Sequence, residues 1–277
     1  MRPAPSTPSP AEIEHFDDHG YVAVRAAFAP GDAQAMQDEW WSELAEAHGV
    51  LRDDRSTWRQ PAGDLKQAKI SPLQETISTA RVRGVIDDLL GPDNWRAPLD
   101  WGRVLTTFPQ DGVWDVPTEM WHSDSPFAYH RHAINGLFAV SFVGPVAPRG
   151  GGTLIVSGSQ RLLQRHDARL TPGQRGGRDA AQRELLYRSH PWLMALTGRA
   201  PSPPDRVAAF MDAGTIIDGV AVRVVELTGE PGDMVFGHGA ILHCGAPNHG
   251  AQPRFMRIKT VVTHEGQTFL RGAKPPG

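Results

Sequence analysis

Cysteine is nearly absent from this 277-residue chain, and long apolar runs are lacking altogether. Its one cysteine, Cys244, excludes an internal disulfide and any zinc or iron–sulfur site built from several thiolates. No stretch approaches the roughly 20 consecutive apolar residues of a membrane-spanning helix. Residues 1–16 also lack the apolar centre of a secretion signal. We therefore expect a cytoplasmic protein that acts away from membranes.

The chain also lacks a large excess of positive or negative charge. The chain has 28 Lys and Arg against 31 Asp and Glu, a net charge of −3, which argues against a nucleic-acid binder that relies on a strong positive field. The hydrophobic fraction of 40% suffices for a packed core. With no internal repeat and no clear linker, we expect a single domain over residues 1–277. We expect it to act on a small molecule, as a monomer or homodimer.

The first hundred residues are predicted to be mainly helical. A loose arm over residues 1–8 precedes a helix that Ser9 can cap, with Pro10 at its first position and Glu12 completing a capping box. Gly20 can end this helix. A short strand and two further helices are expected at residues 21–24, 30–48 and about 72–90. This helical part spans residues 9–100.

From Trp101 onward the pattern changes to short β-prone runs separated by Gly and Pro. The runs cover residues 104–108, 136–143, 152–156, 220–227, 233–237 and 257–263. Many short strands at this spacing are typical of a sandwich or barrel. Between Arg161 and Arg206 the strand pattern gives way to an arginine-rich stretch with a helix-like piece at 179–189. We interpret about 161–215 as an insertion beside the barrel mouth. The predicted fold is mainly β with flanking helices.

The segment Trp121-His122-Ser123-Asp124 carries the most chemistry. On a strand, residues two apart point to the same face, so the His122 imidazole and the Asp124 carboxylate would converge. An isolated His-x-Asp is more often a hydrogen-bonded pair on a surface strand than a metal site. The interpretation therefore needs a third ligand.

His243 supplies a candidate third ligand from far along the chain. Two imidazoles and one carboxylate on one face of a metal leave the opposite positions open, which is the arrangement of non-haem iron(II) oxygenases. A bidentate 2-oxoacid and O2 could occupy those positions. Cys244 follows His243 directly and would face the other way on a strand, so we do not expect it to be a ligand.

Arg254 lies eleven residues after His243. A planar guanidinium can bind the distal carboxylate of 2-oxoglutarate through two parallel hydrogen bonds, which lysine cannot reproduce. The simpler interpretation is a surface arginine before a strand. Arg257 competes for the same role.

The chain resembles the phytanoyl-CoA dioxygenase family of iron(II)/2-oxoglutarate oxygenases over most of its length. The resemblance is carried by residues 13–24, 121–124, 151–160 and 232–243, followed by Pro247-Asn248 and Arg254. It implies a double-stranded β-helix, a cupin-like jelly-roll barrel buttressed by the N-terminal helices. It also implies His122, Asp124 and His243 as iron(II) ligands, Arg254 as the 2-oxoglutarate arginine, and His238 as a supporting or structural histidine.

Two features refine what the resemblance implies. Family members often have Ser or Thr two residues after the distal histidine, where this chain has Gly245, and Thr153 is our candidate for the missing hydrogen bond to the co-substrate. Related halogenases replace the carboxylate ligand with a small residue. Because Asp124 is present, halogenation is disfavoured.

The expected activity is hydroxylation of an unactivated C–H bond in a small metabolite or natural-product intermediate. The resemblance implies iron(II), 2-oxoglutarate and O2, with release of succinate and CO2. Desaturation, epoxidation or cyclisation would use the same cofactors. Two alternatives of other classes are a jelly-roll binding protein without turnover and a zinc-dependent hydrolase.

The sequence indicates little about the substrate. Four aromatic residues near the His-x-Asp pair could line a substrate pocket, although aromatic residues near a barrel more often form core. They are Trp101, Trp114, Trp121 and Phe127. The arginine-rich insertion could bind an anion, and a solvated charged face is the alternative.

Overall fold

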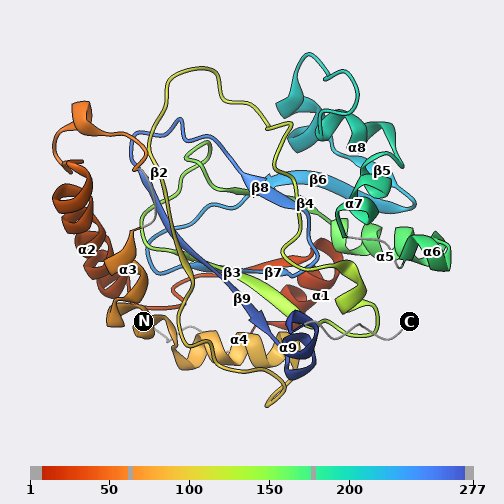
Figure 1. Ribbon diagram of the computed structural model, residues 1–277, viewed down its shortest axis with the longest axis horizontal. Coiled ribbons are helices and arrows are strands. Elements are labelled where there is room, and N and C mark those ends of the chain that lie inside the picture. Colours follow the sequence, from red (N-terminus) through yellow and green to blue (C-terminus); the bar gives the residue numbers. More distant parts are fainter. Residues whose placement is uncertain (1–7, 62–64, 176–178, 272–277) are drawn as a thin grey trace.

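Two antiparallel sheets form the centre of the computed structural model, which describes residues 8–61, 65–175 and 179–271. The strands are β1 (Tyr21–Val24), β2 (Arg103–Thr107), β3 (Gly136–Phe142), β4 (Thr153–Ser157), β5 (Thr215–Ile217), β6 (Val220–Glu226), β7 (Met234–His238), β8 (His243–Gly245) and β9 (Arg254–Val262). The larger sheet has the order β1-β7-β3-β9-β2 and the smaller the order β5-β6-β4-β8 (Figure 1). The predicted arm, residues 1–8, lies outside the described residues apart from Pro8.

The two sheets share a buried core between them. Phe138, Val140 and Phe142 of β3 belong to one apolar cluster with Ile155 of β4. Leu137 of β3 points the other way, into the core beneath the N-terminal helices. Because successive side chains of a strand point to opposite faces, burial at every position of β3 means that both of its faces are covered.

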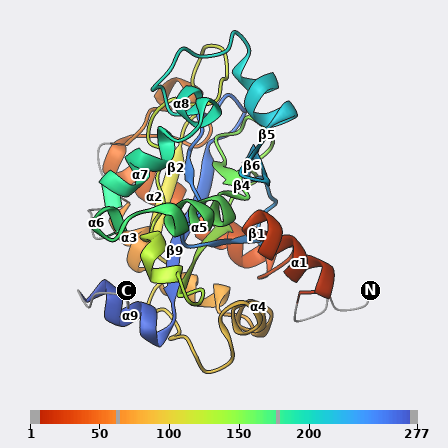
Figure 2. The same cartoon turned by 90° about the vertical axis from the view of Figure 1, so that its right-hand side faces the viewer.

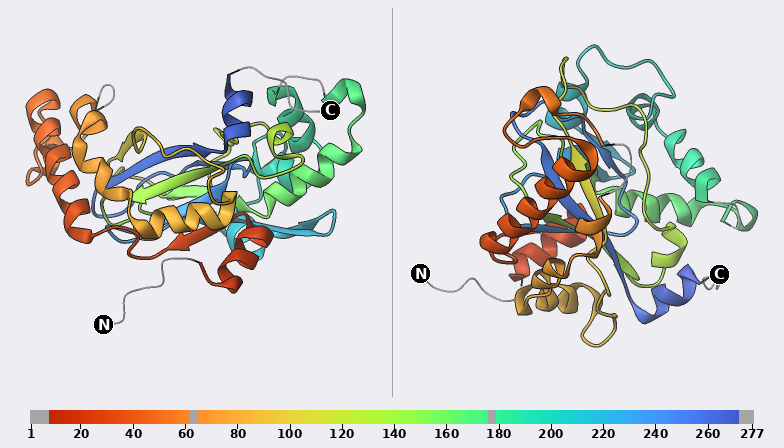
Figure 3. Two further views of the ribbon diagram at one scale, coloured as in Figure 1. Left: turned by 90° about the horizontal axis from the view of Figure 1, so that it is seen from below. Right: turned by 60° about the vertical axis from the view of Figure 1, so that its left-hand side comes forward.

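Helices cover the outer face of each sheet (Figures 1 and 3). They are α1 (Pro10–His19), α2 (Pro30–His48), α3 (Lys66–Ile70), α4 (Ala80–Leu90), α5 (Ser159–Arg169), α6 (Pro172–Arg175), α7 (Asp179–Tyr187), α8 (Pro191–Leu196) and α9 (His264–Leu270). Trp40 of α2 and Ile86 of α4 join the core of the larger sheet. Leu162 of α5 and Leu193 of α8 join that of the smaller sheet. Figure 2 shows α5–α8 grouped beside β4 and β6.

The prediction of a mainly β protein is wrong, because helix accounts for 40% of the chain and strand for 21%. The N-terminal part is helical as expected. The excess comes from the arginine-rich region, where α5–α8 form although only one helix-like piece was expected, and from α9, which we did not predict. Helices packed on both outer sheet faces bury apolar surface that a bare two-sheet barrel would expose.

Several local predictions are confirmed. Ser9 accepts a hydrogen bond from the Glu12 amide, and the Glu12 carboxylate accepts one from the Ser9 amide, which completes the capping box. Gly20 ends the helix at a φ of 81°. The six predicted β runs from Trp101 onward correspond to β2, β3, β4, β6, β7 and β9.

The predicted helix from 72 to 90 is two elements. A 3-10 helix over Pro72–Ile77 precedes α4, and Thr79 separates them. The Thr79 hydroxyl accepts a hydrogen bond from the Val82 amide and donates one to the carbonyl of Ala27. These bonds favour a new helix start over continuation.

No helix in the described ranges is both long and apolar enough to span a membrane.

Candidate metal centre

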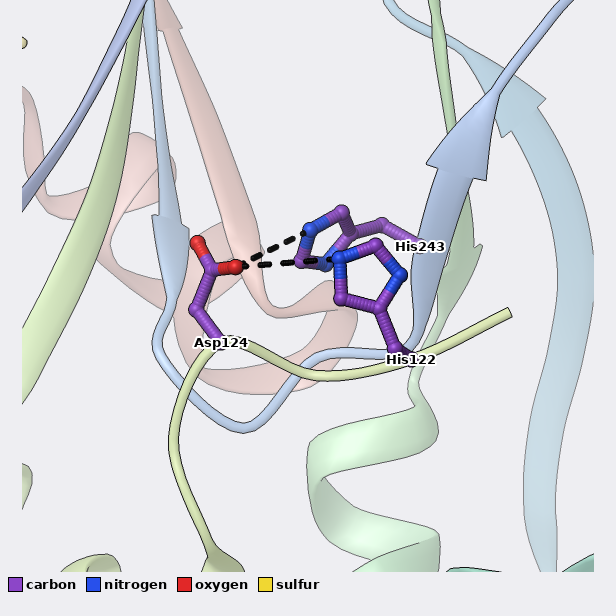
Figure 4. A group of neighbouring side chains, drawn as sticks. All are labelled: His122, Asp124 and His243. Atoms are coloured by element: carbon purple, nitrogen blue, oxygen red, sulfur yellow. Dashed lines mark ion pairs between the residues drawn. The ribbon is translucent and has the colours of Figure 1, made fainter. Parts of the chain in front are cut away.

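His122, Asp124 and His243 meet in space although they are far apart in sequence (Figure 4). One ligand atom from each lies within 4.8 Å of the others. The Asp124 Oδ1 atom is 3.5 Å from Nε2 of His243 and 3.8 Å from Nε2 of His122. Among the described residues this is the one group of three or more His, Cys, Asp or Glu side chains with the spacing of a metal site.

Backbone carbonyls orient both imidazoles. Nδ1 of His122 lies 2.7 Å from the carbonyl oxygen of Met120, and Nδ1 of His243 lies 3.1 Å from that of Ile241. A carbonyl only accepts, so each Nδ1 carries the proton and each Nε2 presents a lone pair to the common centre. Figure 4 shows both rings directed toward Asp124. This tautomer suits metal binding.

Reciprocal backbone hydrogen bonds join the two histidines. The His122 amide donates to the His243 carbonyl at 2.9 Å, and the His243 amide donates to the His122 carbonyl at 2.8 Å. We predicted His122 and Asp124 on one face of a strand, and this local expectation is wrong. His122 forms an isolated bridge to β8, and Asp124 lies in the following bend. The bend, instead of strand alternation, turns the carboxylate toward the imidazoles.

The electrostatics favour an ionised carboxylate. Burial alone would raise the pKa of Asp124, but the neighbouring His243 and His122 outweigh it and lower that pKa below its ordinary value. The group therefore stays an anion at neutral pH. Two imidazoles and one carboxylate form a hard-to-borderline donor set for a divalent cation.

A cavity of about 660 Å³ opens in front of these three side chains. It lies between the sheets, since β2, β4, β8 and β9 all contribute to its wall. Arg254 and Thr153 line the same cavity. The structure thus brings all five predicted site residues to one space, while their roles remain predictions.

The register of β9 separates the two competing arginines. Arg254 pairs with Thr107 and shares the inner face of the sheet with Met256, whereas Arg257 points to the outer face. There Arg257 donates to the carbonyl of Gly102 and lies over the ring of Trp40. Arg257 is therefore a buried structural residue beyond the cavity.

Arg254 is buried in the cavity wall and incompletely bonded. It donates to the carbonyl of Gly151, and its Nε–H has no hydrogen-bond partner in the described structure. Burial lowers the pKa of Arg254 to about 10, and the nearby Glu226 works in the opposite direction. The guanidinium remains charged at neutral pH, so an anion in the cavity would satisfy both its charge and its free donor.

The other histidine of the closing motif lies elsewhere. His238 ends β7 and accepts a hydrogen bond from the Ala240 amide. Its ring stacks on Phe16 at a centroid distance of 6.4 Å and lies tilted against His130 at 4.7 Å. It lines a separate cavity from the metal-site group. Cys244 points into the apolar core of the smaller sheet, as its position beside His243 predicted.

The four aromatic candidates for a substrate pocket are core residues. Trp101 belongs to the core under the N-terminal helices, and Trp114, Trp121 and Phe127 belong to the core of the smaller sheet. None of them lines the metal-site cavity. This agrees with the expectation that aromatic residues near a barrel more often form core.

Arginines of the α5–α8 region are largely engaged with the protein itself. Arg161 and Arg169 pair with Asp18 and Asp218 on the surface, and Arg206 donates to several backbone carbonyls. One charged group on the cavity wall was not predicted from the sequence. Its residues come from three separate segments. It consists of Lys69, Asp100, Arg103 and Lys259.

Comparison with known proteins places this geometry in context. A profile of the phytanoyl-CoA dioxygenase (PhyH) family matches residues 16–256. A search of curated protein sequences found no significant match.

Solved structures share the fold at low sequence identity. HygX from Streptomyces hygroscopicus, with nickel and 2-oxoglutarate bound, is 14% identical, covers 93% of this chain and 88% of its own, and has a TM-score of 0.55. The alpha-ketoglutarate-dependent carbocyclase SnoK from nogalamycin biosynthesis is 15% identical, with coverages of 97% and 92% and a TM-score of 0.55. EctD from S. alaskensis, with bound Fe, is 17% identical, with coverages of 92% and 76% and a TM-score of 0.54.

At such identities the structural likeness establishes the fold alone. The family profile, however, matches most of the chain. This protein belongs to the phytanoyl-CoA dioxygenase (PhyH) family.

Proposed function

We propose that the chain is an iron(II)- and 2-oxoglutarate-dependent oxygenase acting on a small molecule. The observation that carries the proposal is the convergence of the three metal-type donors and a buried, partly unbonded Arg254 on one cavity. Family membership and the solved structures with iron or 2-oxoglutarate support it. Two facing antiparallel sheets agree with a double-stranded β-helix, which we propose as the core architecture.

The donor set fits iron(II). His122, Asp124 and His243 would hold the ion through Nε2, a carboxylate oxygen and Nε2, with the Nδ1 protons fixed by backbone carbonyls. All three side chains line the cavity, so an ion held by them would be open to it. Such a facial triad leaves room for a chelating co-substrate and O2.

The surroundings also fit 2-oxoglutarate. Its C5 carboxylate would meet the Arg254 guanidinium, which remains cationic despite burial. Thr153 and Gly245 face each other across β4 and β8 within the same cavity. We propose that the Thr153 hydroxyl provides the hydrogen bond that a Ser or Thr at position 245 would otherwise give.

Iron(II) with 2-oxoglutarate would supply activation of O2 coupled to oxidative decarboxylation, releasing succinate and CO2. The chain itself positions the metal and the co-substrate and limits side reactions. Asp124 stays ionised, the imidazoles keep one tautomer, and Arg254 fixes the orientation of the co-substrate. We propose hydroxylation of an unactivated C–H bond as the outcome. Desaturation, epoxidation and cyclisation are the outcomes that a product analysis would have to separate from it.

The first experiment measures co-substrate use directly. Purified protein with iron(II), 2-oxoglutarate and a metabolite library should form succinate and consume O2 when the substrate is present. His122→Ala, Asp124→Ala and His243→Ala should abolish this and weaken binding of Mn(II), measured by calorimetry. His238→Ala is the matched histidine control, and it should retain metal binding.

The same variants distinguish the alternatives. A zinc hydrolase has no need of Arg254, so activity retained in Arg254→Ala would favour hydrolysis. Binding of metal and 2-oxoglutarate without succinate formation under any library condition would favour a binding protein. Loss of metal in His238→Ala but not in His243→Ala would refute the ligand assignment.

A further inference from the structure

A loop with three consecutive glycines lies beside Arg254. We call residues 149–152 the glycine loop. Thr153, the next residue, begins β4 and lines the metal-site cavity. Within the loop, the carbonyl of Gly151 accepts the hydrogen bond that Arg254 donates. The backbone of the glycine loop therefore fixes one side of the guanidinium, whose Nε–H has no partner in the described structure.

Glu226 of β6 bonds the glycine loop at both ends. Its Oε2 atom accepts a hydrogen bond from the Arg149 amide at 2.7 Å, and its Oε1 atom accepts one from the Gly152 amide at 3.0 Å. One carboxylate thus holds the backbone on both sides of Gly151. Leu154, two residues after the loop, pairs with Glu226 across β4 and β6, so the sheet fixes the place of the carboxylate.

The conformation of the glycine loop needs support from its neighbours. Gly151 has a φ of 82°, and a Cβ atom there would lie 2.9 Å from Cβ of the buried Asn248. Glycine alone accepts this position, but it does not fix its own backbone. The amide of His249 donates to the Arg149 carbonyl and that of Ala246 to the Gly152 carbonyl, at 2.8 and 3.0 Å. Glu226 holds the amides of the same two loop residues, which leaves the Gly151 carbonyl between them for Arg254.

Glu226 also contributes charge without entering the cavity. Arg254 lines the metal-site cavity, whereas Glu226 does not. Burial lowers the pKa of Arg254, and the charge of Glu226 opposes this shift. Burial raises the pKa of Glu226, and the amides of the glycine loop oppose that shift. The loop therefore stabilises the anion on one side and bonds the cation on the other.

We propose, resting on the proposed function, that Glu226 is a positioning residue for the co-substrate. It holds the glycine loop so that the Gly151 carbonyl occupies one donor of the Arg254 guanidinium. The remaining donors are then directed at the C5 carboxylate of 2-oxoglutarate. Glu226 contacts neither the metal nor the co-substrate. Its influence is confined to the C5 end and does not reach the end that chelates the metal.

The alternative is a carboxylate that stabilises the fold alone, and Glu43 provides the matched control. Glu43 of α2 accepts hydrogen bonds from the amides of Gln67 and Ala68, at 3.1 and 2.8 Å, and does not line the cavity. Glu226→Gln and Glu43→Gln each keep the size of the side chain and place an NH2 group against a backbone N–H. Both should lower the melting temperature. We expect a change in co-substrate binding in Glu226→Gln alone.

Two 2-oxoacids separate positioning from folding. 2-Oxoglutarate and 2-oxopentanoate share the same carbon chain and chelating end, but 2-oxopentanoate lacks the C5 carboxylate. Each is titrated into protein loaded with Mn(II), and water proton relaxation reports the displacement of water from the ion. Glu226→Gln should weaken 2-oxoglutarate binding about fivefold, because a charge-assisted network is disturbed. The affinities for 2-oxopentanoate and for Mn(II) should stay close to those of the wild type.

A measurement on the wild-type protein covers the case of a variant that does not fold. Hydrogen exchange of the glycine loop is followed by mass spectrometry, with Mn(II) alone and after addition of each oxoacid. 2-Oxoglutarate should slow exchange in residues 149–152 more than 2-oxopentanoate does. The reason is that the C5 carboxylate joins Arg254, the Gly151 carbonyl and the amides bound to Glu226 in one network.

Four results would overturn this inference while leaving the oxygenase proposal intact. They are unchanged 2-oxoglutarate binding in Glu226→Gln, equal weakening of both oxoacids in that variant, an equal loss of 2-oxoglutarate affinity in Glu43→Gln, and equal protection of the glycine loop by both oxoacids. Failure of the wild-type protein to bind Mn(II) or 2-oxoglutarate would instead contradict the proposed function.

Discussion

Arg254 and Arg257 lie on the same strand but point to opposite faces of the sheet. Each guanidinium has an Nε–H without a hydrogen-bond partner in the described structure, but Arg254 lines the cavity, whereas Arg257 points to the outer face of the sheet and is fully buried. Arg254→Lys should weaken 2-oxoglutarate binding on the order of tenfold, because an ammonium lacks the paired donors of a guanidinium. Calorimetric titration with 2-oxoglutarate in the presence of Mn(II) would measure this.

Arg257→Lys is the natural comparison for that titration. It should lower the melting temperature, because bonds to Gly102 and Ala68 are lost from a buried site, and should leave 2-oxoglutarate affinity nearly unchanged. Equal loss of affinity in both variants would show that Arg254 acts through the fold and not through contact.

His130 predicts a specific dependence of stability on pH. Burial lowers the pKa of His130 from 6.5 to about 4 in the folded chain. As the pH falls, the unfolded chain therefore takes up a proton at a higher pH than the folded chain does. This contribution to stability is complete above pH 6.5 and is lost as the pH falls toward 4. The loss amounts to about 3 kcal/mol.

Urea unfolding between pH 7 and pH 4 would test this dependence. His130→Gln should show a shallower decline of unfolding free energy, whereas the exposed His132→Gln should follow the wild-type curve. Parallel curves for wild type and His130→Gln would rule out His130 as the source.

At the scale of the element, Thr79 marks the break that divides the predicted helix. Its hydroxyl caps α4 and also bonds to the carbonyl of Ala27. Thr79→Ala should lower the unfolding free energy by about 1–2 kcal/mol, measured by chemical denaturation. Thr268→Ala, which removes an exposed local bond to Glu265, should cost less than about 0.5 kcal/mol. Similar losses in both would indicate no special capping role.

Helices and strands could be predicted where residues close together in the sequence determine their bounds. The Ser9–Glu12 box and Gly20 define α1 without help from the rest of the molecule. The β-prone runs were readable because alternation and turn residues bounded them. By contrast, β8 contains three residues, His243–Gly245, and its pairing with β4 is set by distant packing that no short pattern encodes.

The site was predictable in composition and less so in geometry. His122, Asp124 and His243 follow from residue types and family resemblance, but the bend that turns Asp124 inward has no strand alternation behind it. The charged group on the cavity wall was missed because Lys69, Arg103 and Lys259 come from three segments. Only the assembled sheet edge brings them together.

On the scale of the whole molecule, metal binding should stabilise the fold. The three proposed ligands join the loop at His122 to β8, so an ion held there would bind the folded chain and not the unfolded one. At a free ion concentration of 100 times Kd the gain is about 2.7 kcal/mol. Thermal unfolding with Mn(II) and with a chelator would show a higher melting temperature with the ion. Asp124→Ala should show almost no difference, and an equal shift in that variant would place the ion elsewhere.

The backbone bridge between His122 and His243 has a consequence for protein synthesis. A ribosome delivers the first histidine long before the second, and such distant pairing forms only once most of the sequence is available. A partly translated chain therefore has nowhere to hold a ferrous ion with half its coordination free. Under the proposed function, reactive oxygen chemistry would be confined in this way to chains that have been translated past His243.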